Sequence, residues 1–258
     1  MGVGMTHNFV RGLRNVLPER VVAELQALDH WLRGEPELRL IRRLCSHNKT
    51  AVDVGANIGT YSHFMRKHAR AVTAYEPNPS LASRLERLYS DVRVRNVAVS
   101  DRAGEVVLRI PVVGKNPQHE LASISQKFEG VEAVMQYKVD AVRLEDETLV
   151  DVGFLKIDVE QHEREVLLGA IGCIRRWRPI VMTETTPLLY QAGLLESFRF
   201  LTELDYVGWF TFRNRSHPFD HFEPEVHASR TLFGTQDFMN PNVFFFPREV
   251  PGDPILNG

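Results

Sequence analysis

The first part of the chain repeats its apolar residues at helical spacing. From about residue 17 to residue 44 they fall on one stripe, which is interrupted near Gly34-Glu35-Pro36. The stripe consists of Val21, Val22, Leu25, Leu28, Leu32, Leu38, Ile41 and Leu44. We expect two helices here, in an extension over residues 1–48 that packs on the main domain, caps its substrate side or makes an oligomer contact.

After residue 48 short apolar runs alternate with helical patterns. The runs that read as buried strands cover residues 51–54, 71–75, 92–99, 154–158 and 180–184. Helical patterns cover residues 60–67 and 81–88, a segment through Val166, Leu167 and Ala170, and residues 188–204. This alternation is typical of a mostly parallel sheet with helices on both faces, which binds ligands at the carboxyl ends of its strands. We therefore expect residues 49–258 to form one Rossmann-like α/β domain.

Other segments show the period of two that antiparallel strands have. Residues 104–113 and 136–142 alternate apolar with polar side chains, and residues 206–212 and 242–246 read as a terminal antiparallel pair at the sheet edge. The connection over residues 214–241 is long for a compact domain, and its aromatic residues favour an ordered, functional loop.

Composition and charge narrow the class of protein. Of the 258 residues 43% are hydrophobic, yet no apolar run has the length of a membrane span or a signal peptide. The net charge of −2 offers no general attraction to a polyanion, so nucleic-acid binding is not expected. Cys45 and Cys173 show no metal-ligand spacing and suit a reducing compartment. We expect a cytoplasmic protein without a membrane span.

A glycine turn follows the first strand. Its sequence is Asp53-Val54-Gly55-Ala56-Asn57-Ile58-Gly59, and Glu76 ends the next strand 21 positions after Gly55. Gly55 lets the chain turn sharply, and Gly59 permits close approach at the helix start. An acid at the position of Glu76 is placed to accept hydrogen bonds from ribose hydroxyls. The pattern predicts a nucleoside cofactor.

Two cofactors compete for this turn. A dinucleotide fingerprint has glycine where Asn57 stands, so that the backbone can approach a pyrophosphate. S-adenosylmethionine has no pyrophosphate, and the Asp53 carboxylate would complement its ammonium group. We favour S-adenosylmethionine, and a nicotinamide-dependent oxidoreductase remains an alternative.

Further segments resemble one family. They are Tyr75-Glu76-Pro77, residues 96–101, residues 154–160 with Glu163, and Glu184. Together with the glycine turn, over about residues 50–246, they resemble the FkbM family of S-adenosylmethionine-dependent methyltransferases. The resemblance implies a class I fold with a seven-stranded, mostly parallel sheet, and methyl transfer to a hydroxyl of a sugar, glycolipid, polysaccharide or related secondary metabolite.

The same resemblance implies cofactor contacts. Gly55, Asn57 and Gly59 would line the methionine part, and Glu76 would hold the ribose. Asn96 and Ala98 belong to a segment expected near the adenine, and Asp158 is counted with these contacts. One departure is Gln161, where the family usually has glycine. If that glycine takes a positive φ, the entry to the helix after Glu160 differs here.

Methyl transfer from a sulfonium to a hydroxyl requires alignment and removal of the hydroxyl proton, by a base or by a divalent ion. Asp158, His162 and Glu184 are our candidate catalytic residues, because they follow or end neighbouring strands. Asp158 and Glu184 are also candidate ligands of Mg²⁺, which prefers oxygen donors. Glu160 and Glu163 have a plainer interpretation as acids that complement a helix dipole.

Polar and aromatic residues elsewhere have weaker cases. One group of polar residues has the types of a zinc site but lies between prolines that interrupt the spacing, so a polar loop is the favoured interpretation. The group consists of His217, Asp220, His221, Glu223 and His227. His119 is a candidate contact for acceptor hydroxyls, and Phe219 and Phe222 form a hypothetical platform for a sugar ring.

The sequence thus predicts an O-methyltransferase with a small-molecule, glycan or glycolipid acceptor. The alternative acceptors are a protein or another small molecule, and a homo-oligomer is possible.

Overall fold

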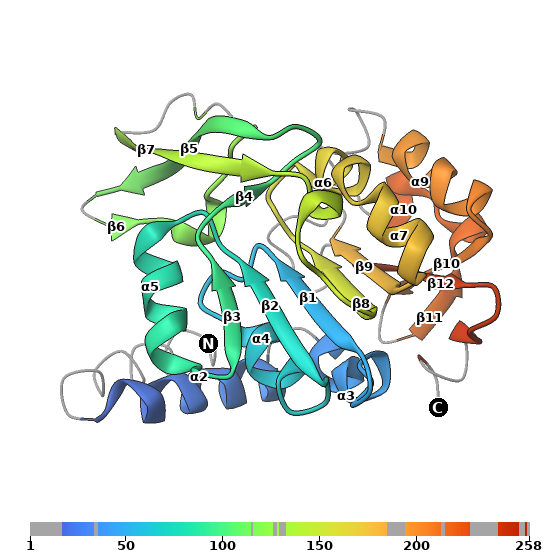
Figure 1. Ribbon diagram of the computed structural model, residues 1–258, viewed down its shortest axis with the longest axis horizontal. Helices are drawn as coiled ribbons and strands as arrows, with labels where there is room; N and C mark the ends of the chain where they lie inside the picture. The colour runs from blue at the N-terminus through green and yellow to red at the C-terminus, as the bar shows by residue number, and fades with distance from the viewer. Residues whose placement is uncertain are drawn as a thin grey trace.

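The computed structural model describes residues 17–33, 36–114, 116–125, 128, 133–184, 194–212, 215–227, 242–252 and 256. Its main sheet has the strand order β11-β10-β12-β9-β8-β1-β2-β3 (Figure 1). The parallel strands are β1 (Thr50–Val54), β2 (Ala71–Tyr75), β3 (Val92–Arg95), β8 (Val152–Ile157) and β9 (Ile180–Glu184). The antiparallel strands are β10 (Tyr206–Phe212), β11 (Arg215–Pro218) and β12 (Asn242–Pro247). The sheet is therefore parallel only over its β9–β3 part.

The expectation of seven strands is wrong by one. The additional strand is β11, at the start of the segment expected to be a loop, where Phe212 pairs with Arg215 and Trp209 with Pro218. The described part of that segment continues in η4 (Phe219–His221) and α10 (Pro224–His227). The sequence missed β11 because a four-residue edge strand carries too few residues for a periodic signal. The expected pairing of β10 with β12 is confirmed.

A second sheet has the strand order β4-β7-β5-β6 and lies beyond the carboxyl ends of β2 and β3 (Figure 1). It consists of β4 (Ala98–Val99), β5 (Gly104–Val113), β6 (Asn116–Pro117) and β7 (Ala133–Val142), and η2 (His119–Leu121) follows β6. The expected single strand over residues 92–99 is thus split between two sheets. The chain leaves the main sheet at Asn96, whose side-chain amide donates to the carbonyls of Glu76 and Pro77 at 2.8 and 3.0 Å.

Helices cover both faces of the main sheet, because successive strand residues point to opposite faces. In β8, Phe154 packs in one core cluster, while Leu155 and Ile157 pack in the other. The first cluster includes residues of α4 (Thr60–Met65) and α5 (Pro79–Leu88); the second includes residues of α6 (Glu163–Gly169), α7 (Ile171–Trp177) and α9 (Leu194–Glu203). Expected helices over residues 60–67 and 81–88 correspond to α4 and α5, and the described part of the one expected over residues 188–204 corresponds to α9.

The first described helices are α2 (Glu19–Arg33), η1 (Pro36–Leu40) and α3 (Ile41–Leu44). Helix α2 contacts α4 and α5, and α3 contacts α4 (Figure 1). Thr211 of β10 donates a 2.5 Å hydrogen bond to the buried carboxylate of Glu37, which joins η1 to the main sheet. The domain boundary near residue 48 and the role of this region as a cap or oligomer contact stay predictions.

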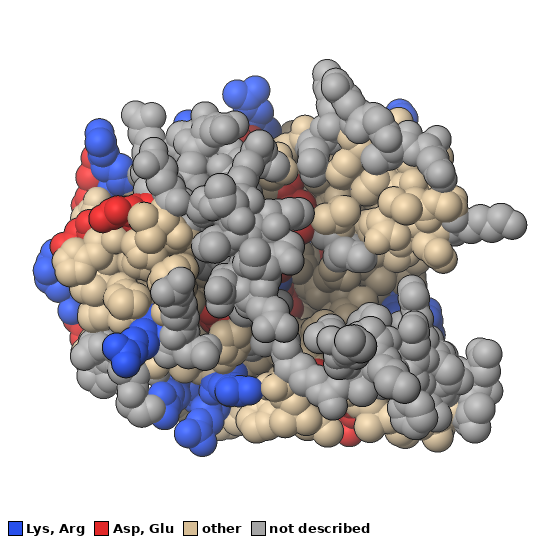
Figure 2. All heavy atoms as spheres, turned by 180° about the vertical axis from the view of Figure 1, so that it is seen from behind, with Lys and Arg blue, Asp and Glu red and all other residues tan. Residues whose placement is uncertain are grey.

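Two surface properties bear on partners. None of the described helices combines the length and the apolar character that crossing a membrane requires. On the face shown in Figure 2, the acidic and basic side chains of the described residues are interspersed, and they form no unbroken basic surface there. The predictions of a cytoplasmic location and of no nucleic-acid partner remain predictions.

Candidate active site

A cavity of about 780 Å³ lies at the carboxyl ends of β1, β2, β8 and β9. Among its lining residues at these strand ends are Gly55, Asn57, Glu76, Asp158, Glu160 and Glu184. The second sheet and its connections contribute Leu108, Pro117, Gln118, His119, Ala122 and Ile124. The volume lies in the range of sites that bind small molecules and cofactors.

Gly55 allows β1 and β8 to approach each other at the base of the cavity. Its φ is +77°, and a Cβ there would lie 1.8 Å from the carbonyl oxygen of Asp158. Asn57, with φ +50°, is the residue type that tolerates this left-handed region best after glycine. Both line the cavity, as the resemblance implies for the methionine part.

Gly59 serves packing rather than the cavity. It has φ +89°, and a Cβ would lie 2.3 Å from Cδ2 of Leu85. It is not among the lining residues. The expected contact of Gly59 with the methionine part therefore lacks support, because the glycine is needed where α4 approaches α5.

Glu76 lies at the end of β2 and is 5% exposed. Its Oε2 accepts from the backbone N–H of Asn57 at 2.7 Å, and its Oε1 accepts from that of Asn78 at 2.8 Å. Burial raises the pKa of Glu76 to about 7, although the two backbone donors favour the charged form. Because each carboxylate oxygen has two lone pairs, Glu76 can still accept bonds from hydroxyl groups in the cavity.

Asp53 is fully buried and does not line the cavity. Its Oδ2 accepts from the Ser62 hydroxyl at 2.6 Å, and the Lys156 ammonium lies 3.4 Å from its Oδ1. The expected contact of Asp53 with a methionine ammonium is not supported, because a protein ammonium already takes that position.

Lys156 is a functional candidate that sequence reasoning missed. It is 3% exposed, lines the cavity, donates to the Gly55 carbonyl at 3.0 Å and lies 3.2 Å from Oδ2 of Asp158. The signal was available, since a lysine inside an apolar strand run is rarely buried without a partner. In the sequence, Lys156 belongs to the segment of residues 154–160 that carries the family resemblance.

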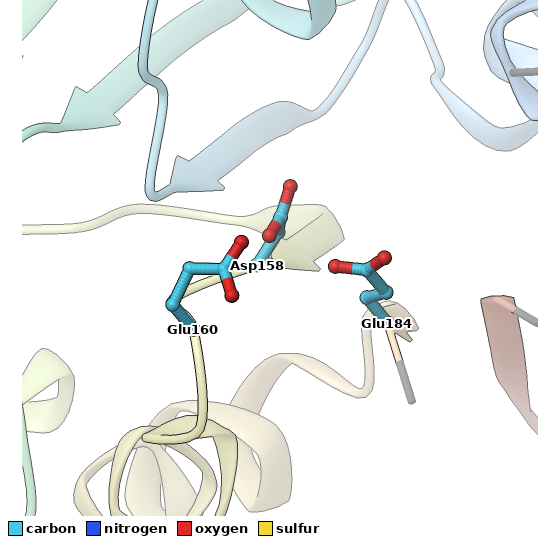
Figure 3. A group of neighbouring side chains, drawn as sticks. All are labelled: Asp158, Glu160 and Glu184. Carbon is cyan, nitrogen blue, oxygen red and sulfur yellow. The ribbon is translucent and has the colours of Figure 1, made fainter. Parts of the chain in front are cut away.

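Three carboxylates meet where β8 and β9 end (Figure 3). One oxygen each from Asp158, Glu160 and Glu184 lies within 4.8 Å of the others. The sequence predicted Asp158 and Glu184 here. The sequence favoured Glu160 as an acid that complements a helix dipole, but the structure places it in the same acid cluster. Among the described residues it is the one such group with the composition of a metal site.

The loop that carries Glu160 has an unusual backbone. Glu160 and Gln161 have φ values of +50° and +71°. Gln161 thus keeps the left-handed conformation without glycine, and the chain enters α6 despite this departure from the family. Glu163 is 1% exposed beneath the loop and accepts from the Val159 N–H at 3.3 Å, so it is more than a decoration of the first helical turn. Burial raises the pKa of Glu163 to about 7.

His162 lines the cavity, but both nitrogens of its ring have hydrogen-bond partners within the protein. Its Nε2 lies 2.9 Å from the Ser100 hydroxyl, and its Nδ1 lies 2.6 Å from the Ser125 hydroxyl. Burial lowers the pKa of His162. Since both ring nitrogens have protein partners, the expected catalytic role is not supported, and the imidazole links the start of α6 to the second sheet.

Of the two residues expected near the adenine, one lines the cavity and the other does not. Ala98 lines the cavity together with Val97 and Val99. Asn96 does not line it, because its amide binds the backbone at Glu76 and Pro77.

The aromatic loop residues pack in the core. Phe222 contacts Phe210 with ring centroids 4.8 Å apart, and Phe219 contacts Phe245 at 5.4 Å. Neither Phe219 nor Phe222 lines the cavity, so the structure does not support a sugar platform there.

Comparison with known proteins decides the family. A model of the methyltransferase FkbM domain matches residues 53–208. The chain belongs to the FkbM methyltransferase family. This confirms the resemblance seen in the sequence, and it argues against the nicotinamide alternative. No curated protein matches the chain.

A solved structure supports the fold of this FkbM family member. Methyltransferase FkbM from Methylobacillus flagellatus KT is 16% identical, with a TM-score of 0.51 over 95% of this chain. The chain spans 60% of the length of that protein. An rRNA methylase from Streptococcus thermophilus is 9% identical with a TM-score of 0.47, and the match covers 81% of this chain and 92% of the methylase. At 16% identity the comparison with methyltransferase FkbM shows the class I methyltransferase-like α/β fold alone.

Proposed function

We propose that the protein is an S-adenosylmethionine-dependent O-methyltransferase. Its acceptor in this proposal is a hydroxyl of a sugar, glycolipid, polysaccharide or related secondary metabolite. The observation that carries the proposal is the acid cluster Asp158, Glu160 and Glu184, which shares one cavity with Glu76.

The residues of the cavity fit the two ends of this cofactor. Glu76 offers a buried carboxylate to ribose hydroxyls, and Pro77, Leu81 and Ala98 offer apolar surface to an adenine ring. The acid cluster at the other strand ends complements positive charge. When bound, S-adenosylmethionine supplies a methyl group on a positively charged sulfur.

Glu184 accepts the hydroxyl proton in this proposal. As the acceptor oxygen bonds to the methyl carbon, the carbon–sulfur bond breaks, and a methyl ether, S-adenosylhomocysteine and protonated Glu184 remain. Asp158 is held by the Lys156 ammonium at 3.2 Å and therefore suits alignment of the acceptor more than proton removal.

The same carboxylates are donors of the kind that Mg²⁺ prefers. However, a divalent ion bound by Asp158 would be repelled by the ammonium of Lys156, which already compensates its charge. The comparisons give Mg²⁺ no support, and we propose proton removal by a side chain instead.

The charge of the cluster also bears on the acceptor. Three carboxylates repel a phosphate group near the methylated atom, and they accept hydrogen bonds from neutral hydroxyls. This favours sugar-like acceptors over a nucleic acid. Protein side chains and other small molecules with hydroxyl groups remain alternative acceptors.

Calorimetric titration with S-adenosylhomocysteine tests the cofactor, with NADH as the comparison ligand. Micromolar binding of the former alone supports the proposal, and binding of NADH alone would overturn it. Transfer of a radiolabelled methyl group to panels of sugars, glycolipids and hydroxyl-bearing peptides then tests the acceptor. Transfer to peptides alone would replace the sugar proposal by the protein alternative.

A further inference from the structure

His119 belongs to η2, which follows strand β6 of the second sheet, and it lines the cavity. Its Nδ1 lies 2.9 Å from Nδ2 of Asn78, a fully buried residue at the start of α5. The backbone N–H of Asn78 donates to Oε1 of Glu76 at 2.8 Å. His119 is therefore joined through one residue to the acid at the ribose end, whereas the sequence suggested a contact with acceptor hydroxyls.

The hydrogen bonds of Asn78 define the protonation of His119. Oδ1 of Asn78 accepts from the Ser80 N–H at 3.1 Å, which fixes the orientation of the amide. The amide Nδ2 must then donate to His119, so Nδ1 accepts, and the neutral imidazole carries its proton on Nε2. No described residue hydrogen-bonds this Nε2.

We propose that His119 is a cofactor-binding residue that donates a hydrogen bond from Nε2 to the adenosine part of S-adenosylmethionine. This inference rests on the proposed function. Ribose oxygens and adenine ring nitrogens are acceptors, which match a single N–H donor. The tautomer with its proton on Nδ1 could not make this bond, because Nδ1 accepts from the Asn78 amide.

The segment that carries His119 also reaches the acid cluster. Ser123 donates to the Glu160 carbonyl at 2.7 Å, and Ser125 lies 2.6 Å from Nδ1 of His162. A cofactor bond at His119 would thus hold the second sheet over the cavity at one end, while these serines hold it at the other.

Titration calorimetry with S-adenosylhomocysteine and with 5′-methylthioadenosine tests the inference. His119→Phe removes the donor, His119→Gln restores an amide donor near the position of Nε2, and His221→Phe is the matched control on an exposed histidine. We expect His119→Phe to weaken both ligands equally, by roughly 3- to 10-fold, the effect of one neutral hydrogen bond. His119→Gln should recover most of the affinity, and His221→Phe should bind as the wild type does.

Several outcomes would overturn the inference. Unchanged binding of both ligands to His119→Phe would return His119 to the acceptor side, and loss for S-adenosylhomocysteine alone would assign it to the amino-acid part. A wild-type protein that binds neither ligand would instead refute the proposed function. If His119→Phe does not fold, ¹⁵N spectra of the wild-type histidines decide: we expect an Nε2–H tautomer whose resonance shifts with 5′-methylthioadenosine, and an Nδ1–H tautomer or an unchanged resonance contradicts it.

Discussion

The ammonium of Lys156 lies 3.2 Å from Oδ2 of Asp158, where β8 ends at the cavity. Lys156 is 3% exposed, while the Asp158 side chain is 34% exposed. A buried cation thus holds a carboxylate that lines the cavity, and the fully buried Asp53 lies 3.4 Å from the same ammonium. In the proposed function, one of these three charges also aligns the acceptor.

Lys156→Met should destabilise the protein by about 3–5 kcal/mol, because it leaves the buried Asp53 without its cation. Urea unfolding measures this change. Lys138→Met is the matched control: its ion pair with Glu105 is exposed, and its loss should leave the free energy of unfolding nearly unchanged. Equal effects of the two substitutions would contradict the role of Lys156.

Binding of S-adenosylhomocysteine should strengthen as the pH rises from 6 to 8. Burial raises the pKa of Glu76 to about 7. Only the charged carboxylate, whose two oxygens both accept, can accept hydrogen bonds from two ribose hydroxyls while it keeps its backbone donors. We expect up to about tenfold per pH unit below that pKa and a plateau above it. Glu76→Gln should bind weakly and without this dependence, as calorimetry at several pH values can measure. A flat wild-type profile would speak against Glu76.

Glu184→Gln should lower kcat by about 10²- to 10⁴-fold, the usual contribution of a general base, with little effect on cofactor affinity. The rate in the presence of about 5 mM EDTA should stay within about twofold of the rate of the untreated enzyme, since no step of the proposal needs a metal. A loss of activity that Mg²⁺ restores would replace the side-chain base by a metal at the acid cluster.

Glu163→Gln should remove a pH dependence of stability. Burial raises the pKa of Glu163 from 4.5 to about 7, so the folded protein binds a proton more tightly than the unfolded chain does. The wild type must therefore lose stability relative to the variant as the pH rises between these values, by about 1.4 kcal/mol per unit. Denaturant unfolding of both proteins at pH 5, 6 and 7 measures the difference. Glu76 is present in both proteins, so its contribution cancels in the difference between their free energies of unfolding. Parallel curves of this free energy against pH would show that Glu163 does not titrate in this range.

Gln161→Gly should leave stability unchanged or raise it by up to about 1.5 kcal/mol. The left-handed φ of +71° costs glutamine about 1–2 kcal/mol in the folded state. Glycine avoids this cost, but its greater freedom in the unfolded chain lowers stability by about 0.5–1 kcal/mol. Thermal unfolding checks this, and Gln161→Ala, which gains no backbone freedom, is the control. Destabilisation of more than about 1 kcal/mol by glycine would mean that the glutamine side chain itself stabilises the loop.

Local patterns predicted much of the fold. The central parallel strands, the glycine turn and the acid after β2 follow from buried runs and from residues that special backbone angles require, and both are written in a few consecutive positions. Asp158 and Glu184 were predicted together for a related reason, since the carboxyl ends of adjacent parallel strands meet at one edge.

Other features escaped because they depend on distant residues. Edge strand β11 is too short for a period, and the division of residues 92–99 between two sheets depends on the bonds of Asn96 to Glu76 and Pro77. His162 was expected to be catalytic, but Ser100 and Ser125 come from segments that only the fold brings to it.

By itself the sequence determined the order of strands and helices, the family and the edge of the sheet at which the cavity lies. These depend on side-chain period and local backbone preference, which neighbouring residues express. Only the tertiary structure decided which charged groups face the cavity and which face one another. Asp53 and Lys156 are 103 positions apart, and their pairing became visible only once β1 and β8 lay side by side.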